Sequence, residues 1–282
     1  AIEEANHGPA MPYGADPITR RVEARLAEIF ETEVAVFPVA TGTAANALCL
    51  SAMVPPFGAV YCHEEAHVQV DECGAPEFYT GGAKLIPLPG DHGKIDATVL
   101  AATIAGTGNV HAVQPAAVSL SQSTEAGTVY GRDEVGAVAE VARAHGLGLH
   151  VDGARFANAV AAGNHSPAEL TWKAGVDALS FGATKNGALA AEAVIFFRPD
   201  LAETMPFRRK RAGHLFSKMR FLSAQLEAYL RDDLWLRHAR HANAMAGRLA
   251  AGLSALPGAK LSHPVEANEV FVRLPEAAIA AL

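Results

Sequence analysis

The sequence predicts an α/β fold in which helices cover a mostly parallel β-sheet. Between Val34 and Phe197, short apolar runs alternate with segments in which small and apolar residues recur at helical spacing. Hydrophobic residues make up 50% of the 282 residues and charged residues 19%, which is enough apolar material for a large core. These two observations favour one large sheet domain followed by a smaller unit.

Seven of the apolar runs are bounded by turn residues and have the length of strands. They predict strands at residues 34–37, 59–62, 84–88, 116–120, 147–151, 177–181 and 193–197. The segments between them predict helices, including 43–53, 96–104 and 133–145. We therefore expect one seven-stranded sheet.

The pattern changes after Pro199. Residues 216–256 form a long, charged, amphipathic stretch without strand periodicity, and a strand-like run follows at 269–274. We expect a large domain over residues 1–200, a connecting segment over 201–215, and a linking helix with the start of a smaller C-terminal α+β domain over 216–282. The first residues read as the end of a helix and the last as the beginning of one, so we expect the natural protein to continue at both ends.

Charge and cysteine usage exclude several functions. The chain has 23 basic and 30 acidic residues, a net charge of −7, which gives no general attraction for nucleic-acid phosphates. It contains no apolar run of about 18 residues, so we expect a soluble protein without a membrane partner. Cys49, Cys62 and Cys73 lack the spacing of metal ligands, which predicts no metal site and a reducing, cytoplasmic location.

The segment from His150 to Arg155 places Asp152 at the end of an apolar strand. Parallel sheets bind ligands at the carboxyl ends of their strands, and a carboxylate there can keep a pyridine nitrogen protonated. Asp152 could equally cap the helix that begins near Arg155. The segment alone leaves both interpretations open.

A second segment, residues 177–187, is a strand that enters a loop of small residues carrying Lys185. In a cramped, partly buried loop, desolvation disfavours the charged ammonium and frees the amine for Schiff-base chemistry. The alternative is a lysine that extends from the loop into solvent.

A third segment, residues 40–46, follows the first strand and opens a helix. Gly42 and Thr43 would offer backbone amides and a hydroxyl at the positive end of that helix, which suits a phosphate. By itself this signal is weak, because many strand-to-helix turns contain Gly-Thr.

Together, the three segments occur in the order expected of a pyridoxal-phosphate enzyme. With Tyr13-Gly14-Ala15-Asp16, Ala66-His67 and residues 119–130, they resemble the threonine aldolases, within the wider group of β-eliminating lyases. The resemblance covers nearly the whole chain. It implies an aspartate-aminotransferase-like fold, a large seven-stranded domain with a smaller C-terminal domain, and pyridoxal 5'-phosphate as cofactor.

The resemblance also implies roles at the cofactor. Lys185 matches the Schiff-base lysine and Asp152 the partner of the pyridine nitrogen. Gly42 and Thr43 match phosphate ligands, and Thr184 matches a hydroxyl residue that reaches the same phosphate.

At the substrate, the resemblance implies that Arg155 holds the carboxylate and that His67 stacks on the pyridine ring. His67, with His63 or an ordered water, is the candidate proton acceptor near the β-hydroxyl. The alternatives are an ordinary loop histidine for His67 and a salt bridge for Arg155.

Tyr13, Lys210 and Arg211 match elements that reach the site of a neighbouring subunit. This predicts a homodimer with shared active sites, or a homotetramer built from two such dimers. The alternative for the basic cluster, residues 208–211, is a solvated surface.

The activity implied is cleavage of a β-hydroxy-α-amino acid, such as threonine, allo-threonine or phenylserine, to glycine and an aldehyde. The alternatives are an aminotransferase or β-eliminating lyase of the same fold, or a catalytically silent homologue that binds partners. Some threonine aldolases carry a histidine in the segment that matches residues 121–124, and this chain has none there. The serine and the second arginine that complete the carboxylate site in the family are not located in the sequence.

Overall fold

The computed structural model describes residues 1–281 and contains one large sheet. Its order is β1-β7-β6-β5-β4-β2-β3, and β6, β5, β4, β2 and β3 run parallel, whereas β7 is antiparallel to both neighbours. The strands are β1 (Ala35–Val39), β2 (Gly58–His63), β3 (Lys84–Leu88), β4 (Gln114–Ser121), β5 (Gly148–Gly153), β6 (Ala178–Gly182) and β7 (Glu192–Phe196). The predicted seven-stranded, mostly parallel sheet is confirmed.

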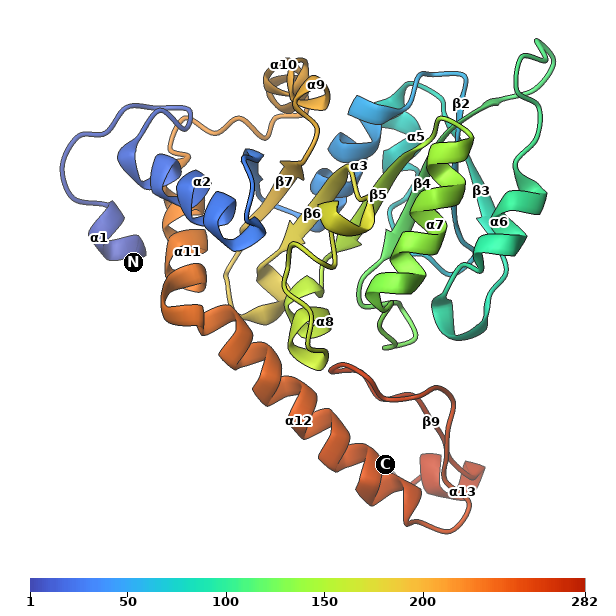
Figure 1. Cartoon of the computed structure of the whole chain (residues 1–282). Coiled ribbons are helices and arrows are strands. Elements are labelled where there is room, and N and C mark those ends of the chain that lie inside the picture. Colours follow the sequence, from blue (N-terminus) through green and yellow to red (C-terminus); the bar gives the residue numbers. More distant parts are fainter. Residues whose placement is uncertain (282) are drawn as a thin grey trace.

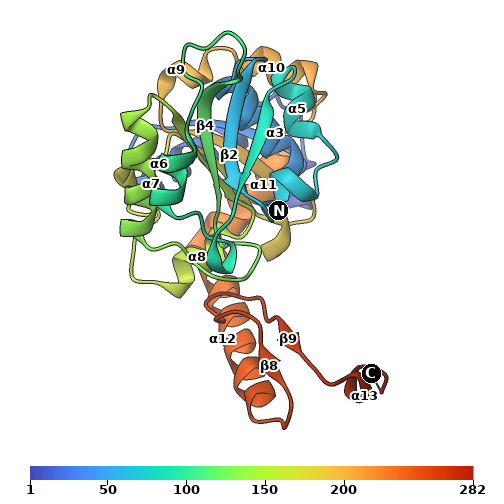
Figure 2. The same cartoon turned by 90° about the vertical axis from the view of Figure 1, so that its right-hand side faces the viewer.

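Helices cover both faces of this sheet (Figures 1 and 2). One group comprises α2 (Pro17–Phe30), α6 (Ala97–Thr103), α7 (Arg132–Ala144), α8 (Phe156–Ala162) and α11 (Arg220–Leu230). The opposite group comprises α3 (Gly42–Met53), α4 (His67–Val70), α5 (Ala75–Thr80), α9 (Pro199–Ala202) and α10 (Met205–Arg211). The remaining short elements of the large domain are α1 (Ile2–Ala5), η1 (Asp91–Gly93), η2 (Trp172–Ala174) and η3 (Thr184–Asn186).

Strand residues alternate between two separate cores because successive side chains point to opposite faces of a sheet. In β2, Ala59 and Tyr61 pack in the core beneath α2, α7 and α8, whereas Val60 and Cys62 pack on the opposite face. The strands are therefore buried on both sides, which explains why they read in the sequence as continuous apolar runs.

The long amphipathic stretch is not one helix. It divides into α11, the short η4 (Arg231–Asp233) and α12 (Leu234–Ser254). Asp232 and Asp233 have φ of 51° and 53°, a left-handed conformation that cannot continue a right-handed helix. The chain therefore changes direction before α12.

Beyond this bend, α12 and the last elements project away from the sheet (Figure 2). These elements are β8 (Lys260–Leu261), β9 (Val272–Arg273) and α13 (Glu276–Ile279). The strand expected at 269–274 is shorter than predicted, since within residues 1–281 it pairs only with the two-residue β8. The proposed division at residues 200 and 215 stays a prediction.

Within the described part of the chain, none of the helices combines the length and the apolar character needed to cross a lipid bilayer. The cytoplasmic location stays a prediction.

Candidate active site

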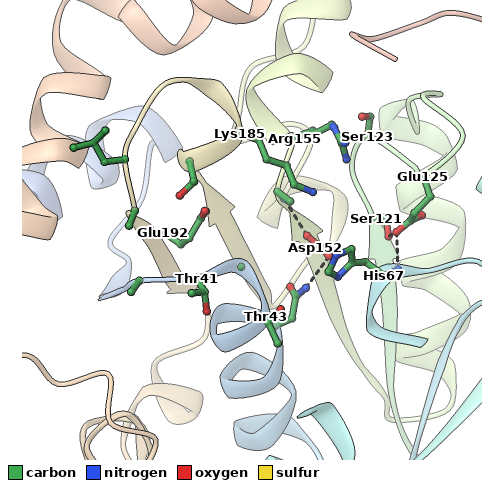
Figure 3. A pocket seen from close by; sticks show the side chains of 17 residues that line it. Thr41, Thr43, His67, Ser121, Ser123, Glu125, Asp152, Arg155, Lys185 and Glu192 are labelled. Atoms are coloured by element: carbon green, nitrogen blue, oxygen red, sulfur yellow. Dashed lines mark hydrogen bonds between the residues drawn. The ribbon is translucent and has the colours of Figure 1, made fainter. Parts of the chain in front are cut away.

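A cavity of about 420 Å³ opens between the amino end of α3 and the carboxyl ends of β4, β5 and β6 (Figure 3). This volume lies within the range of about 300–1,000 Å³ typical of small-molecule sites. Seven predicted site residues line it: Gly42, Thr43, His67, Asp152, Arg155, Thr184 and Lys185. The fold brings them together because parallel strands present their carboxyl ends at one edge of the sheet.

Asp152 is the buried acid of the cavity, with only 5% of its surface exposed. Its Oδ2 accepts a hydrogen bond of 2.7 Å from the Asn46 side-chain amide, and its Oδ1 accepts one of 3.0 Å from the backbone amide of Ala154. It does not cap α8, whose N-cap position is Arg155. The capping alternative for Asp152 is therefore excluded, and Asp152 is one of the residues that line the cavity.

A chain of hydrogen bonds connects Asp152 with His67. The Nδ2 atom of Asn46 also donates to Oε1 of Glu72 at 2.7 Å, and that oxygen lies 2.8 Å from His67 Nδ1. Burial raises the pKa of Glu72, and the hydrogen bond to Glu72 raises the pKa of His67. Ligand atoms of His67, Glu72 and Asp152 lie within 4.8 Å of one another, and these hydrogen bonds account for their grouping.

Glu125 lies on the side of His67 that is opposite to Asp152 (Figure 3). Its Oε1 accepts hydrogen bonds from the Ser121 hydroxyl at 2.6 Å and from the backbone amide of His67 at 2.8 Å (Figure 3). Its Oε2 is buried and has no partner among residues 1–281. Burial raises the pKa of this carboxyl group.

The amino end of α3 forms the opposite wall. Thr41 is its N-cap, and the Thr41 hydroxyl accepts a hydrogen bond of 3.2 Å from the amide of Ala44. The amides of Gly42 and Thr43 occupy the first helical positions, which have no carbonyl within the helix to bond. A Cβ atom built on Gly42 would meet no atom within 4 Å, so an anion can approach this end closely.

Lys185 lies in η3, directly after β6, and its side chain extends toward Asp152 (Figure 3). The expectation of a partly buried lysine is wrong for the single chain, since Lys185 is exposed. What is buried is the base of the loop. The amide of Ala183 donates to Glu192 at 3.0 Å, and the Asn186 side chain donates to the Tyr229 hydroxyl at 2.7 Å.

Arg155 forms an ion pair with a residue from the other end of the chain. One guanidinium nitrogen lies 2.7 Å from Oε1 of Glu269, and both side chains are mostly buried. The salt-bridge alternative for Arg155 is thus present, although its partner is Glu269 rather than Asp152.

Four predicted residues lie outside this cavity. His63 is 4% exposed, and its ring nitrogens bond the carbonyl of Gly90 and the amide of Glu65, so the structure does not bring it to the site. Tyr13, Lys210 and Arg211 are exposed. Lys210 Nζ lies 5.2 Å from the centre of the Tyr13 ring, so these two residues share one surface.

A model of the β-eliminating lyase family matches residues 1–277. The chain belongs to the β-eliminating lyase family. This lyase-family chain is 48% identical over its whole length to a low specificity L-threonine aldolase of Pseudomonas aeruginosa, and it covers 82% of that relative. It is 46% identical to a low specificity L-threonine aldolase of Pseudomonas sp. (strain NCIMB 10558), again over 100% of this chain and 82% of the relative. Within the family, it belongs to the threonine aldolases.

A solved structure supports the same placement. The lyase-family chain resembles a threonine aldolase from Leishmania major with a TM-score of 0.93 and 29% identity, over 99% of this chain and 81% of that one. The likeness confirms the predicted fold class, a pyridoxal-phosphate fold of the aspartate-aminotransferase type with a large, mostly parallel sheet.

Sequence reasoning missed several polar residues of this lyase-family site: Thr41, Asn46, Glu72, Ser121, Ser123, Glu125 and Glu192. Thr41 had a local signal, since Thr before a helix is a common cap. Asn46 lies one turn into α3 and could have been expected to face the same cavity as Gly42. The other side chains gave no comparable signal.

Proposed function

We propose that this protein uses pyridoxal 5'-phosphate to cleave a β-hydroxy-α-amino acid, such as threonine, allo-threonine or phenylserine, into glycine and an aldehyde. One observation carries this proposal: a single cavity combines the buried carboxylate of Asp152, the amine of Lys185 and the open amino end of α3. The relatives named low specificity L-threonine aldolase support this reaction among those of the fold.

The residues present fit the cofactor. Lys185 would hold its aldehyde carbon as a Schiff base, and Asp152 would pair with its pyridine nitrogen. The amides of Gly42 and Thr43, together with the Thr184 hydroxyl, would bind its phosphate. When bound, pyridoxal phosphate withdraws electrons from the α-carbon of an amino acid.

Asn46 and the Ala154 amide both donate to the buried carboxylate of Asp152, and they hold it in place at the cavity. A carboxylate fixed in this way would keep a pyridine nitrogen protonated, and a bound cofactor would then withdraw electrons more strongly. Asn46 thus serves as a positioning residue for Asp152.

Arg155 and His67 would orient the substrate and the ring. A guanidinium binds a carboxylate with two parallel hydrogen bonds, so Arg155 suits the substrate carboxylate once the ion pair with Glu269 opens. The imidazole of His67 is held by Glu72 through Nδ1 and by its own backbone through Glu125, which fixes the ring against the cavity.

We also propose that two chains share their sites in a homodimer, with a tetramer of two dimers as the alternative. Tyr13 and Lys210 support this arrangement because they meet on an exposed surface and do not line the cavity of their own chain. A dianionic phosphate beside the partial charge of a helix end has room for a further cation.

The experiment is to load the protein with pyridoxal phosphate and to measure visible absorbance and aldehyde release from threonine stereoisomers and phenylserine. We expect aldehyde and glycine in equal amounts. Lys185→Ala should lose both signals, whereas Lys173→Ala, a lysine that pairs with Glu31 on the surface, should keep both. A keto acid product would indicate an aminotransferase or β-eliminating lyase, and the lack of any cofactor absorbance would indicate a binding subunit.

A further inference from the structure

We infer that Glu125 is the proton acceptor for the β-hydroxyl of the substrate, an assignment that rests on the function proposed above. Aldol cleavage requires such a group, because the hydroxyl must lose its proton as the aldehyde forms. None of the roles that the family resemblance implies is assigned to Glu125.

The hydrogen bonds of Glu125 engage only one of its two carboxylate oxygens. Ser121 and the His67 backbone both donate to Oε1, at 2.6 and 2.8 Å, so the carboxylate is fixed by that atom alone. Oε2 has no partner within residues 1–281 although it is buried. Buried polar atoms are normally hydrogen-bonded, so an unpartnered carboxylate oxygen beside a ligand cavity fits a donor that the ligand brings.

His67 is a weaker candidate for this step than the sequence suggested. Its Nδ1 is bonded to Glu72, and its Nε2 lies 3.6 Å from the carboxylate of Asp71. The hydrogen bond with Glu72 raises the pKa of His67 and already engages Nδ1, so neither ring nitrogen is left without an acidic neighbour. His63 is buried outside the cavity with both ring nitrogens bonded.

The other two carboxylates that line the cavity, Asp152 and Glu192, differ from Glu125 in their bonding or their position. Asp152 is bonded through both oxygens. Glu192 accepts from the Ala183 amide and lies on the side of Thr41 and Thr43, whereas Glu125 lies on the side of His67 and Ser121 (Figure 3). We place the substrate on the side of His67 and Ser121, where Glu125 rather than Glu192 is the carboxylate that would meet its β-hydroxyl.

The step balances as a proton transfer coupled to bond cleavage. The O–H bond of the β-hydroxyl breaks, and its proton passes to Oε2 of Glu125. The C=O bond of the aldehyde forms as the Cα–Cβ bond breaks, and the electron pair of that bond stays on the α-carbon. Glycine is completed when the α-carbon takes up a proton.

The test compares Glu125→Gln with the wild-type holoenzyme. We expect kcat for threonine cleavage to fall by about 10²- to 10⁴-fold, the usual contribution of general acid–base catalysis. Glycine has no β-hydroxyl, so its affinity, measured by the absorbance change on titrating it into the cofactor-loaded protein, should stay unchanged. Glu266→Gln is the matched control, since Glu266 accepts from the Val129 amide at 2.7 Å at the other end of the same loop.

A second variant tests the same residue without removing the carboxylate. The Ser121 hydroxyl lowers the pKa of Glu125, so Ser121→Ala should raise it and move the acid limb of kcat/KM to higher pH. The other groups facing Glu125 are Asp152, which raises the pKa of Glu125, and two neutral ones, Cys62 and Tyr130. Burial raises the pKa of Cys62 to about 12 and also raises the pKa of Tyr130, so neither group titrates near the carboxyl group.

Two outcomes would overturn the assignment: threonine cleavage by Glu125→Gln at the wild-type kcat, or an acid limb that Ser121→Ala leaves in place. If Glu125→Gln fails to fold or to bind glycine, the pH profile of Ser121→Ala decides. Wild-type protein that cleaves none of the β-hydroxy amino acids would instead contradict the proposed function.

Discussion

The guanidinium of Arg155 lies 2.7 Å from Oε1 of Glu269. A carboxylate of the C-terminal segment therefore binds the same guanidinium that we assign to the substrate carboxylate. Arg155 lies two residues after the end of β5, and Glu269 lies three residues before β9. Burial raises the pKa of Glu269, while Arg155 and Lys185 lower it, which places Glu269 in the field of both cations. Substrate and Glu269 therefore compete for the same guanidinium.

Glu269→Gln should bind substrate more tightly. A neutral amide competes less well for Arg155, and we expect KM to fall by about three- to tenfold, a change of about 0.7–1.4 kcal/mol. Steady-state kinetics of aldehyde release measures this. Glu276→Gln, in the exposed α13, is the control and should keep the wild-type KM. A KM for Glu269→Gln equal to that of the control would show that the ion pair is absent in solution.

Asp152→Asn should keep the fold and lose most of the activity. A neutral amide cannot keep a ring nitrogen protonated, and we expect kcat to fall by about 10²- to 10³-fold, as for other preorganised electrostatic groups. Circular dichroism and cofactor absorbance check that the protein is folded and loaded. A wild-type kcat in a variant that is folded and loaded with cofactor would contradict the role assigned to Asp152.

Glu72→Gln should change how stability depends on pH. Glu72 raises the pKa of His67 in the folded protein, so the stability that this bond adds is present below pH 6.5, the ordinary pKa of His67, and is lost as pH rises through the raised value. Burial also raises the pKa of Glu72, so its own contribution to stability likewise decreases as pH rises. We therefore expect Glu72→Gln to lower Tm more at pH 6 than at pH 9.

The control for this measurement is Glu169→Gln. Glu169 lies 4.0 Å from His165 in a pair that is much more exposed, and exposed pairs contribute little. NMR titration of the His67 ring should give a lower pKa in Glu72→Gln than in wild type. An unchanged His67 pKa would mean that Glu72 does not hold the ring.

Shared sites should be visible by complementation. A Lys185→Ala chain lacks the Schiff-base lysine, and a Lys210→Ala chain lacks the cation that contacts Tyr13. If each site takes Lys185 from one chain and Lys210 from the other, a mixed dimer contains one site with both residues, and mixing should restore part of the activity. Sites complete within one chain would show no gain on mixing, and fully active monomers by light scattering would exclude the dimer.

Local patterns in the sequence predicted the seven-stranded sheet and placed each strand end to within two residues. The strand at Lys84–Leu88 agrees residue for residue with its prediction. The expected helix at 43–53 differs from α3 by one residue at its start, and those at 96–104 and 133–145 differ from α6 and α7 by one residue at each end. These features depend on local signals: apolar runs buried on both faces, and small residues at the turns. The same signals placed Gly42, Asp152 and Lys185 at one edge of the sheet.

The contacts between side chains in the cavity could not be predicted from local patterns, because they join segments that are far apart in sequence. Asn46 and Asp152 are 106 positions apart, and His67 and Glu125 are 58 apart, so no local periodicity links them. The pairing of Arg155 with Glu269 and the exposure of Lys185 also depend on how distant segments pack. A hydrogen bond or an ion pair depends on a few ångströms between atoms, and only the folded chain fixes such distances between segments far apart in sequence.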